Sequence, residues 1–143
     1  LSKANFAEII CDKIHVSKQS IKIAKKCIKG LYAITDSINA SGLKDGKYIF
    51  AKNNIIKENN SVKIFDNGTL AGSIITMDKT FKNLIEMNFS TQEAVELTSY
   101  NASKYMGISN IGKIETGYLS NFLVLDKEYN LIDVYLEGKK VND

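Results

Sequence analysis

Two polar side chains, His15 and Asp36, follow apolar runs that are typical of buried strands. The run 31–35 leads directly into Asp36 and then into small polar residues, as when a strand ends in a loop. His15, the only histidine, follows a similar run at 7–11. A carboxylate and an imidazole at strand ends suit general acid–base chemistry. Taken alone, Asp36 also fits a helix cap or turn, and His15 fits a structural or surface position.

A strand–helix–strand unit is expected to bring these two positions together. Ser17 is a plausible N-cap of a helix whose apolar residues recur at helical spacing, with its lysines mostly on the opposite face. We expect Gly30 to end this helix as its C′ residue. Two strands joined by one helix pair in parallel, so their ends lie side by side. We therefore expect His15 and Asp36 to open into the same crevice.

The remainder of the chain is expected to alternate between β and α segments. Short β-like runs separated by asparagine-rich turns fill the region 46–66, which we interpret as a β insertion. A glycine-bracketed loop follows at 68–73, and then two helices, the second of which opens with a capping box at 90–93. Two further strands are expected at 121–126 and 131–138.

Composition and charge exclude several classes of protein. The chain has 143 residues, of which 44% are hydrophobic and 24% charged, as in one modest globular domain. Its net charge of +3 is small and its lysines are dispersed, which argues against nucleic-acid binding. No apolar run approaches the roughly 20 residues that span a bilayer, and no signal-peptide pattern is present. We expect a cytoplasmic protein without nucleic-acid or membrane partners.

The residues of this chain are poorly suited to build a metal site. Cys11 and Cys27 lack metal or redox spacing, and we expect two free, buried thiols in a reducing compartment. A zinc site needs three or four protein ligands, which one histidine, two distant cysteines and scattered carboxylates do not supply. Either the chain is not a metalloenzyme, or the other ligands lie outside it.

Five stretches, in order, resemble the N-acetylglucosamine-6-phosphate deacetylase family of the amidohydrolase superfamily. The stretches 12–16 and 33–37 are similar to the family's Asp-Gly-x-His-Val segment and to its Val-Thr-Asp strand end. The stretch 68–77 is similar to its Gly-x-Leu-(Ala/Ser)-Gly-Ser loop. The stretches 101–103 and 111–121 are similar to its Asn-Pro-Ala helix motif, here without the proline, and to a Gly-x-Ile-x-x-Gly segment of many amidohydrolases.

The resemblance implies an α/β fold: the C-terminal part of a (β/α)8 TIM-type barrel, with its last two strands and helices, plus strands of a small β-sandwich. Residues 1–107 would belong to the barrel of a metal-dependent hydrolase, with the β insertion at about 46–66, and residues 108–143 would be C-terminal strands of the β-sandwich domain. A whole barrel needs roughly 200 residues or more, so we expect a fragment that is inactive alone. Its partners would be the missing N-terminal portion and, in the intact enzyme, a second copy in a homodimer.

The resemblance also implies a reaction, the hydrolysis of the acetamide of N-acetylglucosamine 6-phosphate to glucosamine 6-phosphate and acetate in amino-sugar catabolism. Asp36 would be the catalytic residue that carries a proton from water to the amine. The residues that would bind this phosphorylated aminosugar are Asp12, Lys13, Ile14, His15, Leu70, Ala71 and Gly72. A divalent metal, zinc or iron, would be held mainly by a Glu and two His outside this chain, with Asp36 as its only candidate contact here.

Position 13 departs from the family pattern. The family has glycine where this chain has Lys13, and glycine adopts backbone angles that a lysine adopts only with strain. We therefore expect altered loop geometry beside the substrate.

Two other functions remain open. One is another amidohydrolase that acts on a cyclic amide, such as a dihydroorotase or imidase relative, which would share the strand-end aspartate. The stretches 12–16 and 68–73 argue against it. The other is a non-catalytic half-barrel module that assembles with another chain. Upstream sequence with a strand-end Glu and two strand-end His would favour the deacetylase over both.

Overall fold

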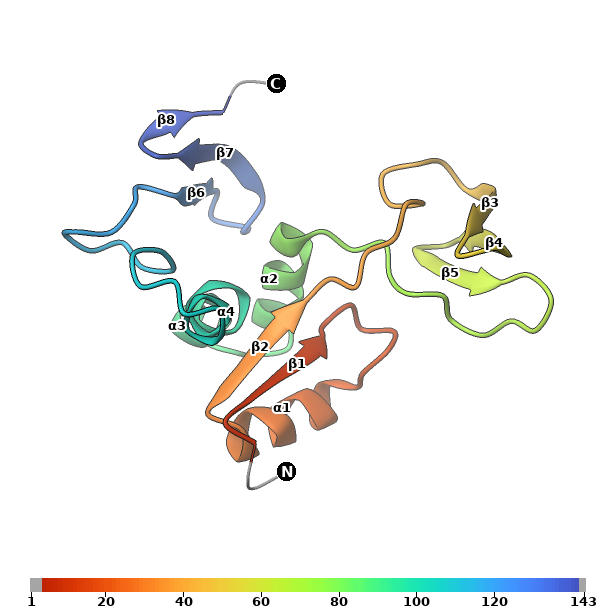
Figure 1. Ribbon diagram of the computed structural model, residues 1–143, viewed down its shortest axis with the longest axis horizontal. Helices are drawn as coiled ribbons and strands as arrows, with labels where there is room; N and C mark the ends of the chain where they lie inside the picture. The colour runs from red at the N-terminus through yellow and green to blue at the C-terminus, as the bar shows by residue number, and fades with distance from the viewer. Residues whose placement is uncertain (1–3, 142–143) are drawn as a thin grey trace.

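The computed structural model describes residues 4–141, which form three separate sheets and a group of helices (Figure 1). Strands β1 (Phe6–Ile10) and β2 (Gly30–Ile34) flank helix α1 (Lys18–Cys27) in sequence and pair in parallel. Ser17 caps α1, since its hydroxyl accepts a hydrogen bond from the Ser20 backbone N–H at 3.2 Å. The predicted strand–helix–strand unit is therefore confirmed.

One face of the β1–β2 pair carries the main hydrophobic core. Leu31 and Ala33 point to the same face of β2, because side chains alternate along a strand. Residues of α1, α2 (Met77–Glu86) and the helix that follows pack against them and close a buried cluster. Its members are Cys11, Ile21, Ile28, Leu31, Ala33, Phe81, Leu84, Met87, Phe89, Ala94 and Leu97.

The helical stretch 91–105 is continuous but contains one π turn. It comprises α3 (Thr91–Val95), the π segment η1 (Glu96–Tyr100) and α4 (Asn101–Tyr105). Both residues that flank the π segment keep helical backbone angles. The predicted capping box at 90–93 is present and begins α3. The buried Asn101 amide donates a hydrogen bond to the Leu31 carbonyl at 2.8 Å, which fixes the helix on β2.

A second, smaller core lies in the antiparallel sheet of β3 (Gly46–Phe50), β4 (Asn53–Glu58) and β5 (Ser61–Ile64). This sheet occupies the stretch expected as a β insertion, and it is set apart from β1 and β2 (Figure 1). The buried members of this core are Ile55 and Val62 of the sheet together with Ile38, Ala40 and Ala71 from the segments before and after it.

The C-terminal stretch forms the third sheet, made of β6 (Phe122–Leu125), β7 (Leu131–Leu136) and β8 (Lys139–Lys140). It is antiparallel and lies on the far side of the helices from β3–β5 (Figure 1). The division of the chain into 1–107 and 108–143 stays a prediction. Within the part of the chain that the structure describes, no helix is long and apolar enough to cross a bilayer.

Two details expected from the sequence are wrong. Gly30 does not end α1 as a C′ residue; α1 ends at Cys27 and Gly30 begins β2. A Cβ on Gly30 would collide with the Asn5 carbonyl oxygen and the Phe6 ring, so this glycine allows close strand pairing instead. Both cysteines are free as expected, but only Cys11 is buried, because Cys27 lies on the solvent face of the last turn of α1.

Candidate active site

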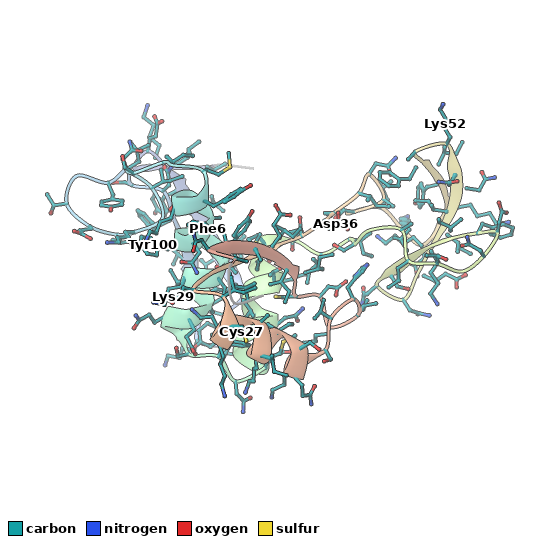
Figure 2. All side chains as sticks on the ribbon, turned by 60° about the horizontal axis from the view of Figure 1, so that its bottom comes forward. Phe6, Cys27, Lys29, Asp36, Lys52 and Tyr100 are labelled. Carbon is teal, nitrogen blue, oxygen red and sulfur yellow. The ribbon has the colours of Figure 1, made fainter. Side chains whose placement is uncertain are left out.

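Asp36 lies two residues beyond the end of β2, in a left-handed backbone conformation with a φ of 50°. A residue with a side chain rarely adopts this conformation, and surrounding contacts must hold it there. The Ser73 backbone N–H donates to the Asp36 carbonyl at 2.8 Å, and the Ser73 hydroxyl donates to the Thr35 carbonyl. Ser73 is itself buried. The Asp36 side chain stays exposed on the chain that leads from β2 toward the β3–β5 sheet (Figure 2).

Gly72 allows the loop at 68–73 to approach Asp36. Its φ is +71°, and a Cβ there would lie 3.0 Å from the Asp36 carbonyl oxygen and 2.7 Å from the Ile38 Cγ2 atom. The same position lies 3.6 Å from the Asp36 Oδ2 atom. A glycine is therefore required by both the backbone angle and the available space. The structure thus places Gly72 against Asp36, and their membership of one substrate site stays a prediction.

Asp12 and His15 form a second group in the loop after β1. The Asp12 Oδ1 atom accepts hydrogen bonds from the backbone N–H groups of Ile14 and His15, both at 2.9 Å. The Asp12 Oδ2 atom lies 2.6 Å from the His15 Nδ1 atom. The Asp12 side chain is 5% exposed and that of His15 is 18% exposed. The carboxylate thus shapes the loop and orients the ring.

The environment of Asp12 keeps its carboxylate ionised. Burial raises the pKa of Asp12, but the backbone hydrogen bonds from His15 and Ile14, together with the His15 ring, outweigh burial and lower this pKa below its usual value. The carboxylate is therefore an acceptor at neutral pH.

Lys13 adopts the glycine-like backbone angle that the sequence comparison suggested, with a φ of 69°. Its ammonium group forms an ion pair with Glu86 at the end of α2, and both side chains are exposed. An exposed pair of this kind contributes little to stability. The strain at position 13 is therefore only weakly offset by the lysine side chain.

The remaining expected site residues differ in their surroundings. Ile14 lines a cavity of about 390 Å³ together with Asp12 and Lys13. Leu70 pairs with β5 through an isolated bridge, and the side chain of Ala71 is buried in the second core. A ligand would therefore meet the backbone of Ala71 and not its methyl group.

The loop with Asp12 and His15 and the segment with Asp36 both begin at the same end of the β1–β2 pair. Ile10 and Ile34, the last residues of β1 and β2, are direct partners in the parallel register, so the loops that carry His15 and Asp36 begin side by side. Within residues 4–141, no hydrogen bond or ion pair joins His15 to Asp36. The shared crevice between them stays a prediction.

Ser73 is the residue of this site that sequence reasoning missed. It was part of the glycine-bracketed loop, but nothing in a serine after a glycine marks it as a support for another loop. That role is seen only in the structure, in the bridge between Ser37 and Ser73 and in the hydrogen bonds that Ser73 donates to the carbonyls of Thr35 and Asp36.

Metal ligands are scarce in this structure. Among the described residues, no group of three or more His, Cys, Asp or Glu side chains could hold a metal ion. Burial and the neighbouring Asp12 carboxylate raise the pKa of the Cys11 thiol to about 12, so this thiol stays protonated. The residues present do not fit a complete metal site.

Comparison with known proteins agrees with this picture. The sequence pattern of the amidohydrolase family matches residues 6–141. The N-acetylglucosamine-6-phosphate deacetylase of Lysinibacillus sphaericus is 31% identical over 93% of this chain and 35% of its own length. A crystal structure of the protein of this name from Thermotoga maritima matches with a TM-score of 0.86 and 30% identity, over 93% of this chain and 37% of that one. That from Pasteurella multocida matches with a TM-score of 0.91 and 25% identity, over 99% and 38%.

These matches confirm the predicted fold class, the C-terminal part of an amidohydrolase barrel. They also show that the chain spans little more than a third of these three relatives, between 35% and 38% of their lengths. The match runs through all three sheets and both loops of the candidate site.

Replacement of Gly72 tests the contact with Asp36. Gly72→Ala and Gly68→Ala introduce the same methyl group at the same φ of +71°, but a Cβ at Gly68 meets nothing within 4 Å. Both variants pay about 1 kcal/mol for the backbone angle. We expect Gly72→Ala to lose roughly 1–3 kcal/mol more in the free energy of unfolding, measured with urea, because the Asp36 segment must shift. Equal losses in the two variants would show that the close approach is not real.

Replacement of Lys13 tests its strained backbone. Lys13→Gly and Lys13→Ala both remove the ion pair, but only glycine relaxes the left-handed angle. We expect the glycine variant to be more stable by roughly 0.5–1 kcal/mol. The same two changes at Lys22, inside α1, serve as the control and should give the opposite order. A Lys13→Ala variant as stable as Lys13→Gly would contradict the angle of 69°.

Proposed function

The chain belongs to the amidohydrolase family, and we propose that it is the C-terminal part of an N-acetylglucosamine-6-phosphate deacetylase. The observation that carries the proposal is the exposed Asp36 carboxylate, held at the end of β2 by the Gly72–Ser73 loop. A carboxylate fixed at a strand end is where barrel enzymes place catalytic groups. The deacetylases that match nearly the whole chain support the choice of substrate.

In the proposed reaction Asp36 moves one proton twice. A water oxygen attacks the carbonyl carbon of the acetamide while the Asp36 carboxylate takes a proton from that water. The tetrahedral intermediate then collapses, and the bond between carbon and nitrogen breaks. Asp36 gives its proton to the leaving nitrogen, which yields glucosamine 6-phosphate and acetic acid, and the acid then loses its proton to become acetate. The carboxylate ends each cycle ionised, as it began.

The other residues form the proposed walls of the substrate site. His15 would bind the aminosugar on one side, with Asp12, Lys13 and Ile14 shaping that wall. The backbone of 70–72 would line the other side. Gly72 places no side chain beside the Asp36 carboxylate, where a Cβ would lie 3.6 Å from the Oδ2 atom.

The amidohydrolase family is generally metal-dependent, and a metal would polarise the amide and activate water. The residues of this chain do not fit such a site, since the described part holds no group of three metal-binding side chains. We propose that the ligands of zinc or iron lie outside this chain, with Asp36 its only contact here.

The remaining features of the proposal follow the same resemblance. The barrel portion would comprise residues 1–107 and the β-sandwich strands 108–143. The partners would be the phosphorylated aminosugar, the N-terminal portion of the enzyme and a second copy in a dimer. A cytoplasmic location is supported by two free thiols, Cys11 and Cys27.

The test is acetate release from N-acetylglucosamine 6-phosphate by the longest native polypeptide that contains this sequence. We expect Asp36→Asn to reduce kcat by about 10²–10⁴-fold, the usual contribution of a general acid–base residue. Asp66→Asn removes one exposed carboxylate in the turn after β5 and serves as the matched control, which should keep normal turnover. Near-normal turnover by Asp36→Asn would remove Asp36 from the reaction, and no turnover by the parent would refute the deacetylase itself.

A further inference from the structure

We propose that Asp12 is a positioning residue for His15, which holds the imidazole with its hydrogen on Nδ1 and leaves Nε2 as the nitrogen that meets a ligand. The inference concerns the ring itself and stands without any assigned reaction. Only the identity of the ligand, an aminosugar, rests on the proposed function. Asp12 would then act on the substrate through His15 and not by direct contact.

The two carboxylate oxygens of Asp12 have different partners, the loop backbone and the His15 ring. Oδ1 accepts from the backbone N–H groups of Ile14 and His15, each at 2.9 Å. Oδ2 faces the His15 Nδ1 atom at 2.6 Å. With only 5% of its side chain exposed, Asp12 is largely enclosed by the loop that it organises. The protein itself therefore occupies both oxygens.

The contact between the Asp12 carboxylate and the His15 ring determines which ring nitrogen carries the hydrogen. An ionised carboxylate is only an acceptor, so a ring nitrogen 2.6 Å away must be the donor. In neutral imidazole this fixes the Nδ1–H tautomer, and in imidazolium Nδ1 also carries a hydrogen. Asp12 thus determines which nitrogen is left for a ligand in either charge state.

The choice of tautomer decides what His15 can bind. When the ring is neutral, Nε2 has a free lone pair and accepts from a hydroxyl or N–H group. When the ring is protonated, Nε2 donates to an oxygen such as a carbonyl or phosphate. A sugar carries hydroxyl donors, so in the proposed enzyme a neutral His15 would bind a hydroxyl group and not the acetyl oxygen.

The chain offers an unusually clean test because His15 is its only histidine. Long-range ¹⁵N–¹H NMR spectra of the full chain, labelled with ¹⁵N, report the protonation of each nitrogen of this one ring. We would raise the pH until the ¹⁵N shifts of the ring no longer change, so that the spectra report the neutral form. The expected result is the Nδ1–H tautomer, whereas histidine free in water favours Nε2–H.

The variant Asp12→Asn is expected to reverse the tautomer of His15. The amide oxygen of the new residue must face the two backbone N–H donors, since the amide nitrogen cannot accept from them. Its NH2 group then takes the place of Oδ2 and donates to Nδ1. We therefore expect the dominant tautomer to switch to Nε2–H while the loop keeps its shape. Asp66→Asn makes the same change of charge elsewhere and should leave the Nδ1–H form in place.

Each outcome decides the proposal. A parent chain with the Nε2–H tautomer overturns it, and this measurement does not depend on the folding of any variant. A folded Asp12→Asn chain that keeps Nδ1–H also overturns it, because a structural role alone would not choose the nitrogen. Failure of the proposed function would be seen separately, as absence of deacetylation by the parent polypeptide with the Nδ1–H spectrum intact.

Discussion

The close approach of Gly72 to the backbone of Asp36 is the constraint on which the candidate site depends. It joins the end of β2 to a loop that is more than 30 residues away in the sequence. Without a side chain at position 72, the Ser73 backbone N–H reaches the Asp36 carbonyl at 2.8 Å. These contacts hold Asp36 at a φ of 50°, where its carboxylate faces solvent instead of the core. The strain is local, and neighbouring hydrogen bonds offset it.

Much of the fold could be predicted because its signals are local or periodic. The apolar runs of β1 and β2, the Ser17 cap and the capping box at 90–93 each depend on residues close in sequence. Gly30 was misassigned for a related reason. A glycine after a helix usually is a C-cap, and only the partner strand shows that space beside the Asn5 carbonyl is what matters here. The π turn within 91–105 likewise had no recognised sequence signal.

The residues of the candidate site could be proposed from the sequence, whereas most of the contacts among them could not. Asp36, His15 and Gly72 follow from strand ends and from a family pattern, and the positive φ of Lys13 follows from the glycine that it replaces. The support from Ser73 was not predictable, because it is a contact between loops distant in sequence. The expected role of Asp12 in substrate binding stays a prediction, but its contacts with the loop backbone and the His15 ring could not be read from the sequence. These contacts depend on interatomic distances, which the sequence does not contain.

In the proposed enzyme the chain would supply a proton carrier and part of a substrate wall, while its described residues hold no cluster of metal ligands. The most direct measurement of this account is acetate release from N-acetylglucosamine 6-phosphate by the purified 143-residue chain, with Zn²⁺ or Fe²⁺ added. We predict no release above a control without protein, because a carboxylate without the metal ligands cannot complete the site. Sustained turnover by the chain alone would contradict the account, since every group needed for the reaction would then have to lie within these residues.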